Sequence, residues 1–434
     1  MLNNYFKVAV RNILKYKIFS FINIAGLAIG IACSLLIFLF ARYELSYDRF
    51  HEKGDRIYRL SSRALIGGTS INQTSSSAET FRAYTSEFPE IESGVKFSRF
   101  GGVTIKSDGR TLIEPLCMAV DSTYFNIFTQ PMIHGDARSA LTEPNTVVLT
   151  ASAAQKYFGR TDVRGELITV GLARNYGDIS FTVTGVCEDL PENSHFHPTM
   201  LLSMASFQAA VDRTGWSWNN FVTYFLLAEG TQAPVLQKKI ADYLEKRNIE
   251  RFGLESYKEW RAGGDYWEYY LQPLQGIHLD SDINGEFEAN GNRNYVYMFM
   301  VISVVILVIA CFNFMNLSTA RSSLRAREVS IRKVVGSSRW GLIRQFLGES
   351  VFLSLLACVI AIGLVYLLLP GYRNIVGREI GFDLLSSPLI IPGLAGFGIL
   401  LGMLSGIYPA FVLSSIDPVR AMKGRMGTDS RVLW

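Results

Sequence analysis

Charge is scarce in this chain, and so are the motifs that would assign a chemistry to it. Asp, Glu, Lys and Arg make up 18% of the 434 residues, while apolar residues make up 49%. The sequence contains no phosphate-binding loop of the form G-x-x-x-x-G-K-[ST], so we expect no nucleotide hydrolysis by this chain itself. It also contains no nucleophile elbow or other recognisable catalytic motif. We therefore predict that the chain is not an enzyme, and we assign it no catalytic residue.

Cysteine is rare as well, with five residues in the whole chain. Cys33, Cys311 and Cys358 lie in apolar runs, where a thiol behaves as a small apolar side chain. Cys117 and Cys187 allow two interpretations, a disulfide in an oxidising compartment or two buried free thiols. Their apolar, strand-like surroundings favour free thiols.

Long uncharged runs dominate what the sequence does contain. They cover residues 19–41, 295–317, 350–369 and 388–415. Each has about the ~20 apolar residues with which a helix crosses a hydrocarbon layer of ~30 Å, and a backbone in lipid satisfies its own hydrogen bonds as a helix. The sequence therefore predicts an α-helical membrane protein with four transmembrane helices, one before and three after a large α+β extracytoplasmic domain. The first run is long for a secretory signal peptide and has a poor cleavage site, so we expect it to stay uncleaved.

Basic residues cluster beside these runs. Because basic residues near span ends stay in the cytoplasm, the clusters predict cytoplasmic N- and C-termini and an external domain. The net charge of +4 therefore reflects topology, and we expect no nucleic-acid partner. Residues 1–18 fit an amphipathic helix on the membrane surface, with a solvated tail as the alternative. The clusters are Lys7, Arg11, Lys15 and Lys17, then Arg321, Arg325, Arg327, Arg332, Lys333, Arg339 and Arg344, and finally Arg420, Lys423, Arg425 and Arg431.

The polar block between the first and second runs alternates strand-like and helix-like patterns. Its length allows two αβ subdomains. We expect strands at 145–150, 167–170, 179–186 and 266–274, and helices at 151–158 and 237–249.

Two patterns in this block imitate metal ligands without completing a site. His195 and His197 can share one face of a strand, but no further ligand accompanies them. Asp280-x-Asp282 starts like a calcium loop, yet Gly291 stands where that loop needs a bidentate carboxylate. We predict a polar turn there and no metal site.

Glycines recur four residues apart in two of the runs, at Gly26 and Gly30 and at Gly398, Gly402 and Gly406. Small residues at this spacing let helix backbones approach closely in lipid. We predict that these glycines pack helices together, within one chain or between two. No charged residue lies in the middle of a run, which argues against an ion-coupled carrier.

The segment 321–346, which we call the elbow, carries a pattern that topology alone does not require. Glu328 precedes Arg332 by four residues, a favourable ion-pair spacing on a helix. Gly336 supplies a helix stop, and one of the two serines after it can cap the helix that leads into the third run. We predict a rigid helix-turn-helix, with a merely topogenic basic loop as the alternative.

Short motifs in the elbow, in the last run and in the external block all occur in one known family. With them the chain resembles the MacB/FtsX-type permeases of ABC transport systems over nearly its whole length. The motifs are Glu328-Val329-Ser330-Ile331-Arg332-Lys333-x-x-Gly336-Ser337, Gln345-Phe346-x-x-Glu349-Ser350, Gly406-x-Tyr408-Pro409-Ala410, Lys156-Tyr157-Phe158-Gly159 and Leu190-Pro191-Glu192-Asn193-Ser194.

The resemblance implies a mechanotransmitter of the bacterial inner membrane. In that family a separate cytoplasmic ATPase, which binds ATP and Mg, docks on the elbow and moves the external domain, and this chain needs no cofactor. Further implied partners are membrane lipid, a second copy or second permease half, a periplasmic adaptor and an outer-membrane channel. The coupling residues that it assigns are Arg325, Glu328, Val329, Arg332, Lys333 and Gly336.

The implied domains are a cytoplasmic helix at 1–18, the first transmembrane helix at 19–42, a MacB-like core domain at 43–294 and an FtsX-like permease domain at 295–434. The chain departs from fused exporters of the family, which carry the ATPase in the same polypeptide, and from relatives with two four-span repeats. We expect a half-transporter or one half of a longer permease. A membrane receptor and a membrane-anchored enzyme are the competing hypotheses, and the exported or extracted substrate stays open.

Overall fold

The computed structural model of the protein describes residues 17–107, 110–172, 176–213, 215–216, 219–253, 256–320, 329–331, 333–382, 384 and 388–415. The chain divides into two compact units. One unit joins Met1–Tyr43 to Asn294–Trp434, and the other is Glu44–Arg293. We call the first the helix unit and the second the α+β domain.

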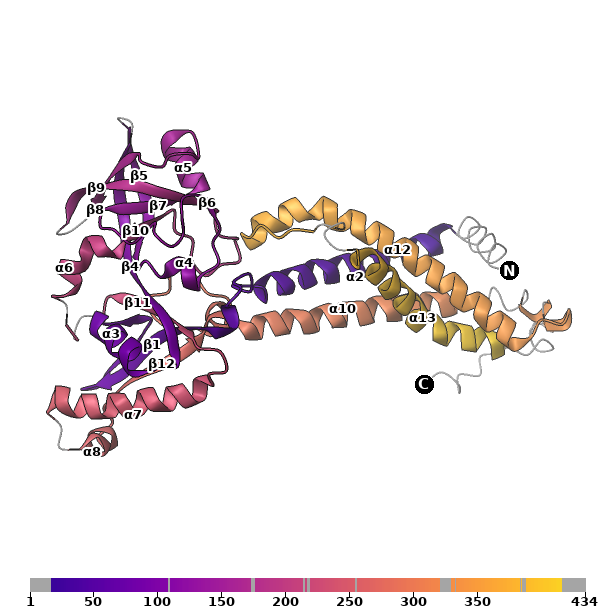
Figure 1. Cartoon of the computed structure of the whole chain (residues 1–434). Helices are drawn as coiled ribbons and strands as arrows, with labels where there is room; N and C mark the ends of the chain where they lie inside the picture. The colour runs from indigo at the N-terminus through magenta and orange to yellow at the C-terminus, as the bar shows by residue number, and fades with distance from the viewer. Residues whose placement is uncertain are drawn as a thin grey trace. The chain divides into compact units, whose positions relative to one another are not determined.

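The helix unit contains the apolar helices that the sequence predicts (Figure 1). Those among the described residues that are long enough to cross a membrane are α2 (Lys17–Glu44), α10 (Arg293–Ala320), α12 (Arg339–Val376) and α13 (Ile390–Ser415). This arrangement, one helix and then three around a mixed domain, confirms the predicted fold class. The predicted helix at residues 1–18 lies almost wholly outside the described residues.

One of these helices is longer than the sequence predicts. α12 has 38 residues and combines the second helix of the elbow with the third apolar run. It starts at Ser338, whose side chain accepts a hydrogen bond from the backbone N–H of Gly341 at 3.2 Å. It continues past Pro370 and ends at Gly377, where φ is 68°.

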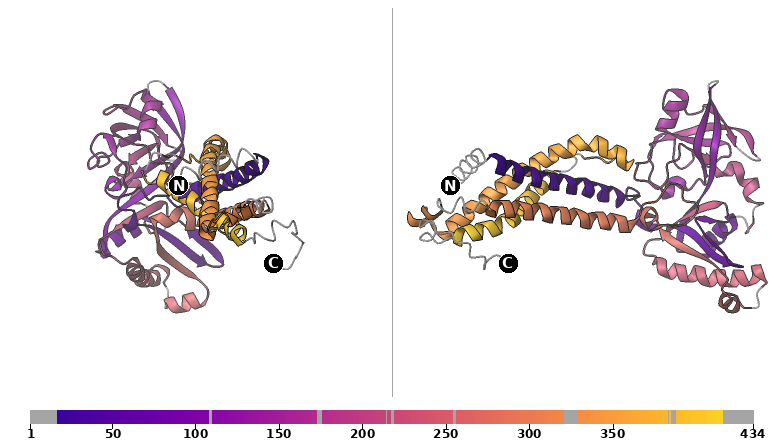
Figure 2. Two further views of the ribbon diagram at one scale, coloured as in Figure 1. Left: turned by 90° about the vertical axis from the view of Figure 1, so that its right-hand side faces the viewer. Right: turned by 180° about the vertical axis from the view of Figure 1, so that it is seen from behind.

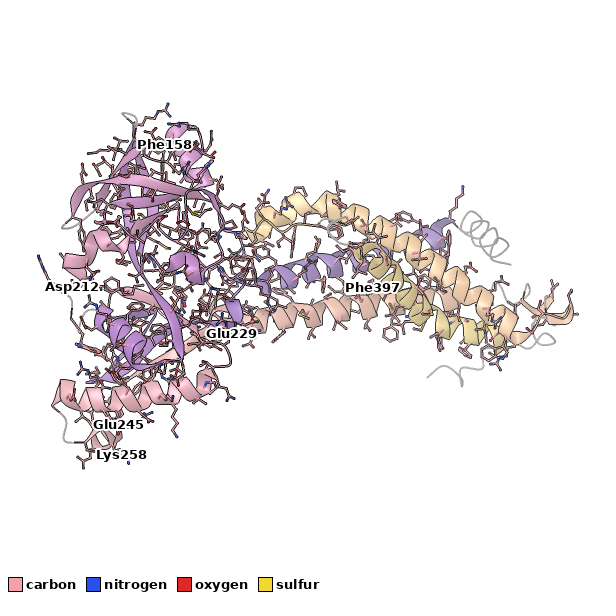
Figure 3. All side chains as sticks on the ribbon, viewed as in Figure 1. Phe158, Asp212, Glu229, Glu245, Lys258 and Phe397 are labelled. Atoms are coloured by element: carbon pink, nitrogen blue, oxygen red, sulfur yellow. The ribbon has the colours of Figure 1, made fainter. Side chains whose placement is uncertain are left out.

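The helices enclose an apolar core of their own. Phe397 on α13, labelled in Figure 3, packs against this core. The outer faces are apolar too, as at Phe21, Val301 and Leu367, which suits helices that face lipid. The core includes Leu27, Ala28, Ile31, Ala310, Phe314, Ala357, Ala361, Val365 and Leu401.

The α+β domain is built on one 12-stranded sheet in the order β12-β1-β11-β4-β5-β10-β7-β9-β6, with β2 on β1, β3 on β11, and β8 on β4 and β9. Most neighbours are antiparallel, while β10 with β5 and β7 with β9 are parallel. The strands are β1 (Ile57–Ile66), β2 (Thr69–Gln73), β3 (Ser75–Ser76), β4 (Ile91–Ser107), β5 (Arg110–Val120), β6 (Met132–His134), β7 (Thr146–Thr150), β8 (Leu167–Leu172), β9 (Gly177–Cys187), β10 (Met200–Ser203), β11 (Phe221–Leu227) and β12 (Tyr266–Pro273).

Short helices cover this sheet in two lobes, which Figures 1 and 2 show. α7 and α3 pack against β1, β11 and β12 in one lobe, while α5 packs against β7 and β9 in the other. The long strand β4 pairs with β11 at its start and with β5 and β8 further on, and so connects the lobes. The helices are α3 (Ala78–Glu87), α4 (Tyr124–Ile127), α5 (Ala151–Phe158), α6 (Gln208–Val211), α7 (Ala233–Phe252), α8 (Tyr257–Ala262) and α9 (Ile277–Asp280), with 3-10 turns η1 (Gly54–Arg56), η2 (Met204–Phe207) and η3 (Leu274–Gly276).

The elements expected from the sequence are present with small shifts at their ends. The helix at 151–158 is α5, and Gly159 ends it with a left-handed φ of 70°. Cys117 and Cys187 are buried free thiols, which confirms the favoured interpretation. Burial raises the pKa of Cys187 to about 12, so this thiol stays protonated.

Candidate coupling site

Two segments connect the α+β domain with the apolar helices along the chain. We call residues 44–54, which begin with the last residue of α2, the α2-linker. Residues 277–293, which end with the first residue of α10, are the α10-linker. Both are bonded to buried polar side chains of the domain, and these bonds decide how firmly the domain holds the chain that leads to each helix.

Asp48 fixes the α2-linker to the loop after β9. Its Oδ1 lies 2.9 Å from Nδ1 of His195 and accepts the backbone N–H of His195 at 3.2 Å. The Asp48 amide donates to the carbonyl of Asn193 at 2.9 Å, and Asn193 Nδ2 donates to the carbonyl of Ser46 at 3.0 Å. Asp48 has a φ of 57°, a left-handed conformation that Asp tolerates better than most residues. This turn directs its amide and its carboxylate to the same loop.

The bonds continue from Asp48 into the sheet. Nε2 of His195 lies 2.7 Å from the hydroxyl of Tyr224 on β11, and all three residues are buried. Burial alone would raise the pKa of Asp48, but the charge and hydrogen bond of His195 outweigh it, and the pKa is lowered. Burial raises the pKa of Tyr224, so its hydroxyl stays protonated. Asp48 is therefore a buried anion whose Oδ1 accepts directed hydrogen bonds from His195.

Arg59 on β1 holds the α10-linker. Its two terminal nitrogens donate to the two carboxylate oxygens of Glu286 at 2.6 and 2.7 Å, and Nη2 also donates to Gln272 at 2.7 Å. The Arg59 side chain is 0% exposed. Burial alone would raise the pKa of Glu286, but the hydrogen bonds from Arg59 lower it, so this bidentate pair stays ionised. A β-bridge between Gln73 and Asn284 fastens the same linker to the sheet edge.

A third contact joins the two linkers to each other. Glu44 Oε2 lies 2.9 Å from Nε2 of His278 on α9. The ring of Tyr47 stacks on His278 with centroids 3.4 Å apart and planes 4° from parallel. A Cβ on Gly291 would lie 2.5 Å from Glu44 Oε2 and 2.9 Å from His278 Nε2, so a larger residue at this position would displace the pair. The position that excludes a calcium loop thus serves close packing.

His197 and Asp280, also weighed as metal ligands, are engaged with protein groups. Nδ1 of His197 lies 2.6 Å from Glu288. Burial alone would lower the pKa of His197, but the hydrogen bond to Glu288 raises it. Asp280 accepts two hydrogen bonds from Arg293, at 2.5 and 2.7 Å. Within the part of the chain that the structure describes, no three metal-ligating side chains gather in one place.

The glycines predicted to pack helices lie at contacts between helices of one chain. A Cβ on Gly402 would lie 2.6 Å from the Cα of Val351, and one on Gly406 would lie 2.6 Å from the Cβ of Ser350. A Cβ on Gly398 would lie 2.9 Å from Sγ of Cys358, which is on α12 as Val351 and Ser350 are. These glycines therefore bring α13 against the backbone of α12.

The first-run glycines bring α2 against α10 in the same way. A Cβ on Gly30 would lie 2.7 Å from the Cβ of Ala310, and one on Gly26 would lie 3.2 Å from Nδ2 of Asn313. Ser34, one turn further along α2, donates a hydrogen bond to the carbonyl of Ser303 at 3.0 Å. The two helices on either side of the α+β domain in the sequence are thus packed together.

Two family models match the chain. The model of the MacB-like periplasmic core domain matches residues 20–243, more than half of the 434 residues, and the model of the FtsX-like permease C-terminal region matches residues 300–418. The chain belongs to the MacB/FtsX-like family of ABC transporter permeases. This confirms the predicted family, and the protein is a multi-pass membrane protein with an extracytoplasmic α+β domain.

Similar proteins include permeases with and without an ATP-binding part in their names. The uncharacterized ABC transporter permease YknZ of Bacillus subtilis is 31% identical over 122 residues, 28% of this chain and 30% of that protein. The macrolide export ATP-binding/permease protein MacB of Salmonella typhi is 24% identical over 317 residues, 70% of this chain and 42% of that protein. This chain spans less than half the length of these relatives. The crystal structure of a permease domain from Porphyromonas gingivalis is 23% identical, covers 52% of this chain and 92% of its own, and has a TM-score of 0.42.

In this ABC permease the elbow is described in part. Arg325, Glu328 and Arg332 lie outside the described residues. Val329 is 2% exposed and packs in one cluster with residues of α12 and α13. Val329 therefore packs the elbow against its own chain, and its side chain is not part of the elbow's exposed surface. The cluster comprises Val329, Leu342, Ile343, Phe346, Ala410 and Leu413.

The permease elbow exposes a different set of apolar side chains. Ile331 is 53% exposed, Val334 68%, Val335 82% and Trp340 68%. Gly336 lies between them with a φ of 100°, and its amide donates to the carbonyl of Lys333 at 3.1 Å. None of these four apolar residues is among the coupling residues that the resemblance assigns. Leu342, Ile343 and Phe346 mark the buried face of α12. Trp340 lies off that face, and helical spacing could have predicted its exposure.

Proposed function

We propose that this chain is the mechanical subunit of an ABC transporter. ATP-driven closure of a separate cytoplasmic ATPase displaces the elbow, the helices carry the displacement, and the extracytoplasmic domain moves a substrate outside the membrane. The supporting observation is that both linkers are held by buried bonds, from Asp48 to His195 and from Arg59 to Glu286. Such bonds hold the linkers firmly to the domain, which suits a connection that transmits force.

The cytoplasmic end of this path is the elbow. Its basic neighbours support a cytoplasmic position for it and for both chain termini, by the positive-inside rule. Its exposed apolar residues, Ile331, Val334, Val335 and Trp340, provide a surface that an ATPase cleft would bury. The bacterial inner membrane is the proposed location.

The substrate is taken from the outer leaflet or the periplasm in this proposal, and it is then exported or extracted there. The spans carry no charge in their middle, which fits a protein that moves no polar cargo through the bilayer. The Salmonella relative is named for macrolide export, so amphiphilic molecules of that kind are one candidate class. A second copy or a second permease half, and a periplasmic adaptor with an outer-membrane channel, complete the proposed assembly.

The elbow gives the direct test. Val335→Asp places a charge on the most exposed of the four apolar residues, and it should weaken binding of the copurifying ATPase about tenfold or more if the cleft buries this side chain. ATP turnover of the complex should fall with it. Both are measured by pull-down and phosphate release in lipid.

Val235→Asp is the matched control, because Val235 is an exposed valine at the start of α7 in the extracytoplasmic domain. Asp is favourable near a helix N-terminus, so this variant should bind and hydrolyse like the wild type. Equal binding and turnover in Val335→Asp and Val235→Asp would sink the proposed docking role of the elbow.

A further inference from the structure

His51 fastens the α2-linker to the loop after α4 through a bond that exists in one protonation state. The backbone N–H of Thr129 donates to His51 Nδ1 at 3.1 Å. A ring nitrogen accepts only when it carries no hydrogen, so the hydrogen of the neutral ring is on Nε2. Two further bonds join the α2-linker to α4 and to the loop after it. The Glu52 amide donates to Thr129 Oγ1 at 2.8 Å, and Lys53 Nζ donates to the carbonyl of Asn126 at 2.7 Å.

The surroundings of His51 offer little to a positive charge. The residue is 4% exposed, and its Nε2 makes no hydrogen bond within the part of the chain that the structure describes. The carboxylate of Asp48 lies beside the ring, with Oδ1 4.0 Å from Nε2. Oδ1 already bonds to His195, and Oδ2 accepts no hydrogen bond from the residues that the structure describes. The rings of Phe50 and Phe128 lie 4.1 and 5.1 Å from the His51 ring, centroid to centroid. One carboxylate is therefore shared by two imidazoles in an apolar pocket.

The charged and titratable groups that face this cluster come from every element packed against it. Burial lowers the pKa of His51 to about 4, since the attraction of Asp48 offsets only part of the desolvation and His195 lowers it further. The groups are Asp48 and His51 from the α2-linker, His195 from the loop after β9, Tyr224 from β11, and the pair of Arg59 and Glu286 beyond Tyr224.

Protonation of His51 removes the hydrogen bond that its ring accepts from the Thr129 amide. The charged ring carries a hydrogen on each nitrogen. The hydrogen on Nδ1 would then point at the hydrogen of the Thr129 amide, so the bond becomes a repulsion between two donors. A charge among phenyl rings is also costly, because the carboxylate of Asp48 lies 4.0 Å away and is shared with His195. The protonated ring belongs to an open state in which it reaches water.

We propose that His51 is a proton-operated catch, which in mild acid releases the α2-linker from the loop after α4. Opening frees the bonds of Glu52 and Lys53 to Thr129 and Asn126 together with that of His51. The inference deepens the proposed function and rests on it for its consequence, because a loosened α2-linker would uncouple the domain from α2.

The direction of the pH effect follows from the two states of His51. In the open state the ring titrates near its ordinary pKa of about 6.5, and in the closed state the pKa is lowered to about 4. The stability that comes from the neutral ring is complete above the open-state pKa and is lost as the pH falls through this window. Between pH 7 and pH 5 the ratio of open to closed linker should rise roughly 20-fold.

Hydrogen exchange on the full chain in lipid nanodiscs tests this inference. Rates at pH 7 and pH 5 are divided by the intrinsic exchange rate at each pH. Amides within 51–54 and 126–130 should open roughly 20-fold more at pH 5, while β7 and β11 should not change. In His51→Asn the rise should disappear, because Oδ1 of Asn accepts from the Thr129 amide at any pH.

His197→Gln is the control, since His197 is a second histidine bonded to a carboxylate, that of Glu288. Its raised pKa acts in the opposite direction, with stability present at low pH and lost as the pH rises. This variant should keep the rise at 51–54. Unchanged opening of the wild type at pH 5, or a full rise in His51→Asn, overturns the inference, and if His51→Asn fails to fold, the contrast between linker and strands in the wild type decides. No ATPase enters this measurement, so its outcome is independent of the docking test on the elbow.

Discussion

The extracytoplasmic domain buries charged side chains, whereas the described helices bury neutral polar ones. Inside the domain, Arg59 pairs with Glu286, Asp48 with His195, and Glu114 with Lys156. In the described part of α2, α10, α12 and α13, apart from Glu44 at the domain end of α2, the buried polar side chains are Ser20, Asn23, Ser34, Ser350, Ser354, Ser405 and Ser414.

The difference follows from the two solvents. A charge inside a bilayer is expensive, so helices rely on close contact of their backbones, as Gly402 does with Val351. A domain in water can bury a charge if an oppositely charged partner lies within hydrogen-bonding distance. Removing either partner then leaves the other as a buried, unpaired charge. The domain is thus held by directed bonds that one substitution breaks, and the helix unit by shape, which a single added carbon atom disturbs.

Removing one partner of a buried pair should give the largest effect. Arg59→Ala leaves the carboxylate of Glu286, which is 12% exposed, without the two hydrogen bonds from Arg59, and the free energy of unfolding of the domain should fall by about 3–5 kcal/mol. Tryptophan fluorescence during denaturation of the full chain in detergent measures it, since Trp267 is buried in the domain.

The double variant Arg59→Met with Glu286→Leu sharpens the same comparison. It removes both charges and keeps the volume, so it should recover most of the lost stability. A double variant as unstable as Arg59→Ala would mean that the packing of Arg59, and not its charge, stabilises the domain.

Added volume at Gly402, in the glycine ridge that Gly398, Gly402 and Gly406 form on α13, should have the next largest effect. Gly402→Val pushes a β-branched side chain into the backbone of Val351, and it should destabilise the contact of α12 with α13 by about 1–3 kcal/mol. Gly396→Val on the same helix is the control, because a Cβ there meets nothing within 4 Å. Thermal unfolding of both variants in detergent should separate them, and equal melting temperatures would show that the ridge contact is incidental.

An exposed ion pair of the domain should show the smallest effect. Lys106 Nζ lies 2.5 Å from Asp178 Oδ2, but both side chains are about half exposed. Lys106→Gln should lower the free energy of unfolding by about 0–1 kcal/mol, because water screens the pair. A loss as large as that of Arg59→Ala would refute the view that burial makes the domain's charges matter.

The parts of the structure that were predictable from the sequence depend on neighbours in the chain. Apolar runs located the helices, and a strand pattern followed by a helix pattern and Gly159 located β7 and α5. The cap at Ser338 and the close contacts of Gly402 also follow from local spacing.

The linker bonds depend on residues that are distant in the sequence. Asp48 and His195 are separated by 147 positions, and Glu44 and His278 by 234. The local pattern around Tyr47 and Asp48 does not indicate His195 as a partner, because only the folded sheet brings the α2-linker and the loop after β9 together. The burial of Val329 could not be predicted for the same reason, since it depends on Ala410 and Leu413 of α13.

The central claim is that the linkers pass a displacement of α2 and α10, relative to α12, on to the extracytoplasmic domain. Spin labels at Glu245→Cys on α7, a position labelled in Figure 3, and at Ile375→Cys, an exposed residue near the end of α12, report this motion in a background without native cysteines. Double electron–electron resonance measures the distance between the labels in the complex with its ATPase, with and without ATP.

The account predicts that ATP shifts this distance in the otherwise unmodified chain and in Glu52→Gln, whose exposed side chain lies in the same linker. With Glu44→Gln and Asp48→Asn together, which keep the volumes but weaken the bonds to His278 and His195, ATP turnover should continue while the shift disappears. A shift that survives unchanged in this double variant would contradict the account.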